Sequence, residues 1–197
     1  MSLRGRLSLL GATAVLVAAC SSGGATAAPS ADTGSGDTPI AGGLLDKVMK
    51  AGKIVMSTDP QYPPQSSLKE DGSFEGFDIE VGTEIAKRLG VPIEFQTPDW
   101  NLITAGSWQG RWDFSVGSMT ITTPREKVLA FSKPYYYTPA QMAASTASGI
   151  TTLDGLKGKV ICAGEATTYY DWLTGALDLG SYTPKEGPPE GSTATTL

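Results

Sequence analysis

The residues best suited to binding a small charged molecule lie between positions 117 and 126. Thr123 is predicted to cap a helix, because Pro124 suits the first helical position and Glu126 follows three residues after the cap. Arg125 then lies in the first helical turn, where the helix dipole disfavours a cation. Hydroxyl side chains stand close by in the sequence, at Ser118, Thr120 and Thr122. The pattern favours an anion such as a carboxylate beside Arg125; the alternative is a solvated arginine on a capped surface helix.

The composition excludes several other kinds of chemistry. The chain has 197 residues, a formal net charge of −5 and no histidine. The lack of histidine removes Ser-His and Cys-His nucleophile pairs and most zinc or iron sites, so we expect neither a metal nor a cofactor. The negative charge and the lack of a basic run argue against a nucleic-acid partner.

The first 43 residues are predicted to lie outside the folded domain. Residues 1–19 have the form of a signal peptide, with arginines at 4 and 6 and an apolar run too short to span a bilayer. Cys20 follows small residues and is predicted to be the lipidated first residue of the mature protein. Simple secretory cleavage after an Ala-x-Ala site is the alternative. Residues 20–43 are rich in Ser, Gly, Ala and Thr and read as a flexible tether.

Cys162 is the only other cysteine. The simpler interpretation is a small buried residue of a strand. The alternative is one half of a disulfide whose other half is absent from this chain.

The next hundred residues, 44–144, alternate between helical and strand patterns. Helices are predicted at 44–50, 77–89, 101–109 and 123–129, and strands at 53–57, 93–96 and 113–116. In the helix at 77–89, an apolar stripe is expected at Phe77, Val81, Ile85 and Leu89. Consecutive prolines predict a loop at 61–65, and Asp71-Gly72 predicts a turn. The order of elements predicts an α/β fold with a largely parallel sheet.

A second unit is expected to begin near residue 145. It contains a short helix and turn at 153–158, a strand at 159–163 and a helix that Thr168 opens and that runs to 176 or 177. Residues 145–183 therefore form a partial second unit, and residues 184–197 are predicted to be an irregular tail. Ligands of open α/β sheets bind where strands end and helices begin, so two such ends facing each other would form a cleft.

Several spaced motifs resemble those of the extracellular solute-binding proteins that serve polar amino-acid ABC transporters. They are the Gly-Phe-Asp-Ile-Glu-Val run at 76–81, the Thr-Asp-Pro-Gln-Tyr-Pro-Pro run at 58–64, the Gly-Arg-Trp-Asp run at 110–113, the Ser-Met-Thr-Ile-Thr run at 118–122 with Arg125, and the segment 153–159. The resemblance covers about residues 44–180. It implies the two-lobed fold of periplasmic binding proteins, with lobe 1 at 44–144 nearly complete and lobe 2 at 145–183 partial.

The same resemblance implies roles for particular residues. Arg125 matches the arginine that binds the ligand α-carboxylate, and Tyr62 an aromatic residue that covers the ligand. Asp59 matches a residue that meets the ligand side chain, and Trp100 an apolar or aromatic wall. The remaining ligand-binding positions are Ser118, Met119, Thr120, Thr167 and Thr168.

Most of these residues also have a purely structural interpretation. Asp59 could cap the loop that follows it, and Tyr62 could pack that loop. Thr167 and Thr168 are needed to cap a helix in any case. The tryptophans at 108 and 112 are predicted to belong to the core, and the tyrosines at 135–137 to an interlobe strand.

The function implied is capture of an amino acid between two lobes, recognised afterwards by a membrane permease, with no catalysis. The chain would be monomeric and held by its lipid on the extracytoplasmic face of a membrane. No residue matches the family's carboxylate for the ligand ammonium, so the chain reads as C-terminally truncated and is expected to bind poorly alone. The alternatives are a cyclohexadienyl or arogenate dehydratase-like enzyme on the same fold, or an extracellular sensory domain.

Overall fold

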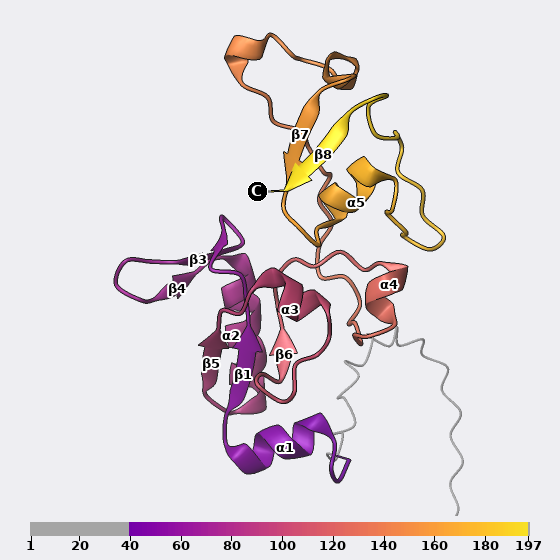
Figure 1. The fold of residues 1–197 in the computed structure, drawn as a ribbon. Coiled ribbons are helices and arrows are strands. Elements are labelled where there is room, and N and C mark those ends of the chain that lie inside the picture. Colours follow the sequence, from indigo (N-terminus) through magenta and orange to yellow (C-terminus); the bar gives the residue numbers. More distant parts are fainter. Residues whose placement is uncertain (1–39, 197) are drawn as a thin grey trace, which may run out of the picture. The chain divides into compact units, whose positions relative to one another are not determined.

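The computed structural model describes residues 40–196 (Figure 1). The predicted signal peptide at 1–19, the lipidated Cys20 and nearly all of the predicted tether lie outside the described residues. Within 40–196, none of the helices has the length and apolar character needed to cross a membrane.

A parallel three-stranded sheet forms the centre of residues 44–116. Strand β1 (Ile54–Ser57) lies between β5 (Ile93–Gln96) and β6 (Phe114–Ser115), and both neighbours run parallel to it. Helix α1 (Leu44–Ala51) precedes β1 and ends at Gly52, which adopts the left-handed conformation at φ +66°. Helix α1 and these strands confirm the elements predicted at 44–50, 53–57, 93–96 and 113–116, and the parallel order of the strands.

Helix α2 (Phe77–Leu89) packs on this sheet through Ile79, Gly82 and Ala86 rather than through the whole predicted stripe. Its buried residues are Asp78, Ile79, Gly82 and Ala86. A Cβ at Gly82 would overlap the Met56 side chain of β1, so glycine is what lets the helix approach the strand closely. The predicted stripe is therefore wrong in part, because Phe77 and Ile85 are exposed while Val81 and Leu89 are only half-buried.

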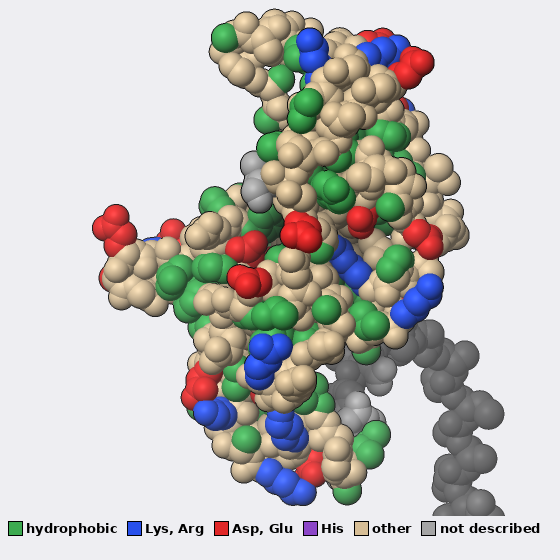
Figure 2. Space-filling model, viewed as in Figure 1, with side chains coloured by type: hydrophobic (Ala, Val, Ile, Leu, Met, Phe, Trp, Pro, Cys, Tyr) green, Lys and Arg blue, Asp and Glu red, His purple; other side chains and the backbone are tan. Residues whose placement is uncertain are grey.

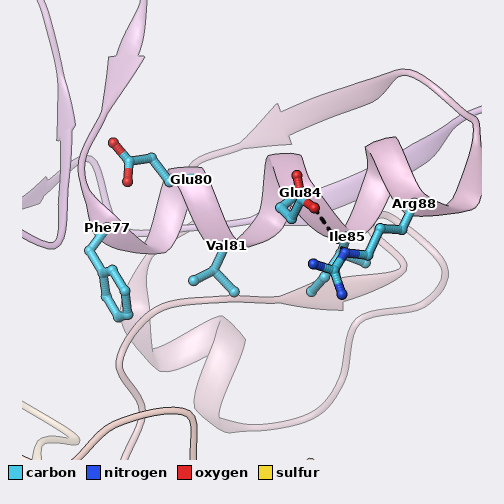
Figure 3. A pocket seen from close by; sticks show the side chains of 6 residues that line it. All are labelled: Phe77, Glu80, Val81, Glu84, Ile85 and Arg88. Carbon is cyan, nitrogen blue, oxygen red and sulfur yellow. Dashed lines mark hydrogen bonds and ion pairs between the residues drawn. The ribbon is translucent and has the colours of Figure 1, made fainter. Parts of the chain in front are cut away.

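Figure 3 shows the outward side of α2, where Phe77, Val81 and Ile85 line a shallow hollow of about 380 Å³. Charged side chains border the hollow, and one pair of them, Glu84 and Arg88, is joined at 2.8 Å.

Three short strands pack beside α2 as antiparallel hairpins: β2 (Gln61–Tyr62), β3 (Ser66–Leu68) and β4 (Phe74–Glu75). The prediction of a loop throughout 61–65 is wrong at its start, since Tyr62 pairs with Ser66. The two prolines occupy the turn of that hairpin, where no ladder hydrogen bond is required of them. The predicted Asp71-Gly72 turn is confirmed between β3 and β4.

Two further helices are shorter than predicted. Helix α3 (Trp100–Thr104) stops early because Gly106 turns the chain at φ +70°. Helix α4 (Thr123–Glu126) ends three residues before the predicted end at 129, and its N-cap is Thr122 rather than Thr123. The Thr123 hydroxyl donates instead to the Asp178 carboxylate at 2.9 Å.

Residues 131–144 contain no strand, so the interlobe strand predicted around residues 135–137 is wrong. The first two tyrosines instead pack on Phe77, with ring centroids 5.8 and 5.5 Å from it. Trp112 is buried as predicted, and Trp108 is half-buried.

The C-terminal third has a separate apolar core. It contains the short 3₁₀ helices η1 (Thr146–Ser148) and η2 (Leu153–Leu156), strand β7 (Val160–Ala163), helix α5 (Thr168–Thr174) and strand β8 (Thr193–Thr196). Its buried residues are Leu156, Ile161, Ala163 and Leu173. The predicted irregular tail is wrong at 193–196, because this β-branched run pairs in parallel with β7.

Two finer predictions in this third are also wrong. Of the two threonines predicted to cap α5, only Thr167 does so, its hydroxyl accepting from the Tyr170 N–H at 3.3 Å, whereas Thr168 is the first residue of the helix. Cys162 is exposed rather than buried, because only the alternate residues Ile161 and Ala163 of β7 face the core.

Candidate ligand-binding site

Arg125 is a buried cation in the first turn of α4. Only 7% of the residue is exposed. The Thr122 cap holds its backbone N–H, and its guanidinium donates to the Thr120 carbonyl at 2.8 Å and to the Ala166 carbonyl at 2.7 Å. Burial lowers the pKa of the guanidinium, and the negative charge of Asp171 acts in the opposite direction. A guanidinium has more N–H donors than these two bonds use, so it retains donors for an anion.

The Ala166 carbonyl connects Arg125 with Trp100. The Trp100 indole N–H donates to the same carbonyl oxygen at 3.1 Å. The guanidinium carbon lies 5.6 Å from the centre of the Trp100 ring, within the range of a cation–π contact. Residue 166 adopts the left-handed region at φ +56°, which directs its carbonyl to these two donors. Trp100 thus forms a wall beside Arg125.

The loop after β6 contains Ser118 in a second left-handed conformation, at φ +50°. The Ser118 hydroxyl donates to the Asp78 carboxylate, with oxygen separations of 2.8 and 3.0 Å. Because a serine hydroxyl has a single hydrogen, this one offers only lone pairs to a ligand. The structure places Thr120 farther along the same loop, exposed, and Met119 between them, half-buried.

Tyr62 and Asp59 both lie on the segment between β1 and β3. One oxygen of the Asp59 carboxylate accepts from the Gln61 N–H at 2.8 Å, so the residue does close a local turn. The Tyr169 hydroxyl next to Tyr62, together with burial, raises the pKa of the Tyr62 phenol. Asp59 is half-buried and its other carboxylate oxygen has no recorded protein donor within residues 40–196.

A large open hollow of about 1450 Å³ brings several of the predicted residues together. Its lining includes Tyr62, Ser118, Thr120 and Thr168. Arg125, Trp100 and Thr167 lie in the adjoining contacts around residues 164–167, where the Thr167 hydroxyl donates to the Gly164 carbonyl at 2.6 Å. The hollow and these contacts define the candidate site.

Three residues of the site were not predicted: Asp78, Tyr135 and Ala166. An acidic residue in the first turn of a helix is ordinary, so Asp78 gave no sign that its carboxylate turns inward. Ala166 contributes a backbone carbonyl, which no side-chain pattern can reveal. Tyr135 could have been found only from its aromatic neighbours in the sequence.

No group of three or more potential metal ligands occurs within residues 40–196. On the face shown in Figure 2, acidic and basic side chains are interspersed with apolar ones. Within the candidate site, the Arg125 guanidinium is a buried positive charge that can attract an anionic ligand.

The model of the bacterial extracellular solute-binding proteins, family 3, matches residues 54–188. The L-cystine-binding protein TcyJ of Escherichia coli (strain K12) is 34% identical over 133 residues, which cover 66% of this chain and 50% of that protein. The probable ABC transporter extracellular-binding protein YckB of Bacillus subtilis (strain 168) is 35% identical over 161 residues, covering 79% and 52%.

A crystal structure of the ancestral amino acid-binding protein AncCDT-1, described as a precursor of cyclohexadienyl dehydratase, is also similar. It is 29% identical, has a TM-score of 0.61, and the match covers 79% of this chain and 65% of that one. The chain spans about half the length of the curated relatives it matches. Its α/β fold is that of periplasmic-binding-protein-like amino-acid binders, represented in part.

Proposed function

Because the chain belongs to the bacterial extracellular solute-binding proteins of family 3, we propose that it captures an amino acid for an ABC transporter. The names of TcyJ and YckB support the two halves of this proposal, an amino-acid ligand and a transporter partner. AncCDT-1, an ancestral amino acid-binding protein, supports the same ligand class.

The observation that carries the proposal is the environment of Arg125. Within residues 40–196, the ion pairs found do not include Arg125, and its two recorded side-chain acceptors are backbone carbonyls. A buried cation is stabilised most by a carboxylate that uses its remaining donors in bidentate fashion. We assign the α-carboxylate of the ligand to this place, beside the Trp100 ring.

The other predicted residues surround that carboxylate in the proposal. Tyr62 covers the ligand, and Asp59 offers its free carboxylate oxygen to a polar or cationic side chain. Thr120, Thr167 and Thr168 border the cleft, together with Ser118 and Met119. Closure of two lobes on the ligand gives the form that a permease recognises.

The proposal extends to the cell envelope. The family is extracellular, so the protein works outside the cytoplasm. We propose that residues 1–19 are its signal peptide and that Cys20 carries the lipid that holds the monomer at the membrane. Mass spectrometry of the protein expressed in a bacterial host would show diacylglycerol on Cys20, and Cys20→Ala would release the protein into the soluble fraction.

Because the chain spans about half the length of its curated relatives, binding is tested on the full-length protein by thermal shift with the proteinogenic amino acids and L-cystine, followed by calorimetry on the best ligand. Arg125→Ala should weaken binding by about a hundredfold, because a buried charge-assisted contact contributes about 3 kcal/mol. Arg88→Ala is the matched control, since Arg88 lies on the exposed side of α2. An affinity of the Arg125 variant within threefold of wild type would overturn the carboxylate assignment.

A dehydratase activity is the second candidate, because AncCDT-1 is described as a precursor of such an enzyme. Incubation with prephenate or arogenate separates the two functions. We expect no product; turnover would replace the transport proposal with catalysis.

A further inference from the structure

Asp78 is a buried carboxylate to which the proposed ligand contacts give no role. The residue has no exposed surface, and it lies in the first turn of α2. The ion pairs found within residues 40–196 do not include it. A buried carboxylate without a cation must be stabilised by hydrogen bonds, and Asp78 accepts them from two hydroxyl groups.

Those hydroxyl groups belong to Ser118 and Tyr135 and close a ring with Asp78. The Tyr135 hydroxyl donates to Asp78 Oδ1 at 2.8 Å, and the Ser118 hydroxyl donates to the same carboxylate. The Ser118 backbone N–H in turn donates to the Tyr135 hydroxyl oxygen at 2.9 Å. The ring joins three segments that are distant in sequence: the start of α2, the loop after β6 and the segment 131–144.

The ring acts on the backbone of Ser118. A non-glycine residue in the left-handed region costs about 1 kcal/mol, so the loop needs compensating contacts to stay in this conformation. Both the side chain and the N–H of Ser118 are held by the ring. Two residues later, the Thr120 carbonyl accepts from the Arg125 guanidinium at 2.8 Å, so the direction that the chain takes at Ser118 decides where this acceptor lies.

We propose that Asp78 is a positioning residue of the ligand site: through Ser118 and Tyr135 it fixes the loop 118–120 against Arg125 without touching the ligand. The identity of the ligand in this inference rests on the proposed function. The way in which the loop is held rests only on the hydrogen-bonded ring. The aromatic contacts of Phe77, next to Asp78, with Tyr135 help to keep the third member of the ring in place.

The test combines NMR spectra of the chain with binding measurements. Asp78→Ala removes both acceptors, so the amide resonances of Ser118 and Thr120 should shift and the affinity for the best-binding amino acid should fall at least tenfold. Asp78→Asn keeps an oxygen that can accept from both hydroxyls, so the resonances and the affinity should stay close to wild type, within about threefold. Recovery by asparagine would show that the hydrogen bonds, not the charge, position the loop.

Tyr135→Phe gives a second, smaller perturbation for the case in which Asp78→Ala fails to fold. It should move the Ser118 amide resonance and weaken binding, whereas Tyr137→Phe should do neither, because Tyr137 is 87% exposed. If the folded Tyr135 and Asp78 variants keep wild-type loop resonances and affinity, the proposal is overturned. If the full-length wild type binds no amino acid, the proposed function fails, while the spectra still decide the role of Asp78.

Discussion

The Ala166 carbonyl accepts two hydrogen bonds, and this sharing predicts a measurable energetic coupling between Trp100 and Arg125. Trp100→Phe removes the 3.1 Å indole bond but keeps an aromatic ring under the guanidinium. Arg125→Met removes the 2.7 Å bond but keeps an apolar side chain of similar length. In either single variant, the carbonyl retains one donor.

The magnitude follows from what the double variant leaves behind. Trp100→Phe removes one hydrogen bond and should lower the free energy of unfolding by about 1 kcal/mol, whereas Arg125→Met removes two and should lower it by about 2 kcal/mol. In the double variant the carbonyl has neither donor, and an unsatisfied buried carbonyl costs about 1–3 kcal/mol. Since Ala166 is only half-buried, the lower end applies, and the coupling should be about 1 kcal/mol beyond additivity. The Thr120 carbonyl also loses its bond to Arg125, but equally in the single and double variants, so it cancels.

Urea unfolding followed by far-UV circular dichroism measures the four proteins of this cycle. Trp108→Phe supplies the matched control, because its indole donates to the Ile103 carbonyl, which Arg125 does not contact. That control should be additive with Arg125→Met. A Trp100–Arg125 coupling smaller than about 0.3 kcal/mol, the usual error of additivity, would refute the shared-acceptor argument.

Three further changes have defined outcomes. Gly76→Ala should cost about 3 kcal/mol in urea unfolding, because Gly76 lies at φ +122° and a Cβ would clash with the Gln65 carbonyl; Gly90→Ala, at φ +71° in open space, should cost about 1 kcal/mol, and equal costs would contradict the clash. Burial raises the pKa of the Asp78 carboxyl above its ordinary 3.8, so the folded state favours the protonated form. The contribution of this group to the free energy of unfolding is therefore fully present below pH 3.8 and is lost as the pH rises through the folded-state pKa. The free energy of unfolding of Asp78→Asn, measured with urea, should therefore rise relative to that of wild type as the pH increases from acid to neutral. Parallel pH profiles of the two proteins would disprove this. Asp113→Ala should cost about 2 kcal/mol by the same measurement, because its buried carboxylate accepts from a lysine of α1 at 2.7 Å and from a backbone N–H of β1 at 2.9 Å; a cost under about 0.5 kcal/mol would show that these bonds contribute little.

Local patterns predicted most of the regular elements correctly. The α1 and α2 helices follow from apolar spacing and from left-handed glycines just past their ends. Strands β1 and β7 follow from short apolar runs, and β5 from alternating apolar and polar residues. These signals act within a few residues, so they depend little on contacts with the rest of the chain. Motif resemblance predicted the family in the same way, and the family match confirms it.

Contacts between distant segments decided what sequence patterns left out. Which side of α2 is buried depends on Met56, a residue of another element that needs the space at Gly82. The strand at 193–196 forms by pairing in parallel with the edge of β7, and its own sequence has no periodicity that predicts a strand. The N-cap of α4 is Thr122 and not the predicted Thr123, because the Thr123 hydroxyl donates to Asp178, 55 residues away in sequence.

Arg125 shows the same division within the site. Its type, its place after a proline and its position in a helical turn are properties of the sequence, and they were enough to single it out as a candidate anion-binding residue. That it is buried, that its guanidinium meets the Ala166 carbonyl, and that Asp78 holds the neighbouring loop through Ser118 and Tyr135 were decided only by the tertiary structure. The physical reason is that hydrogen bonds and burial depend on distances in space, and the residues concerned lie up to 57 positions apart in sequence.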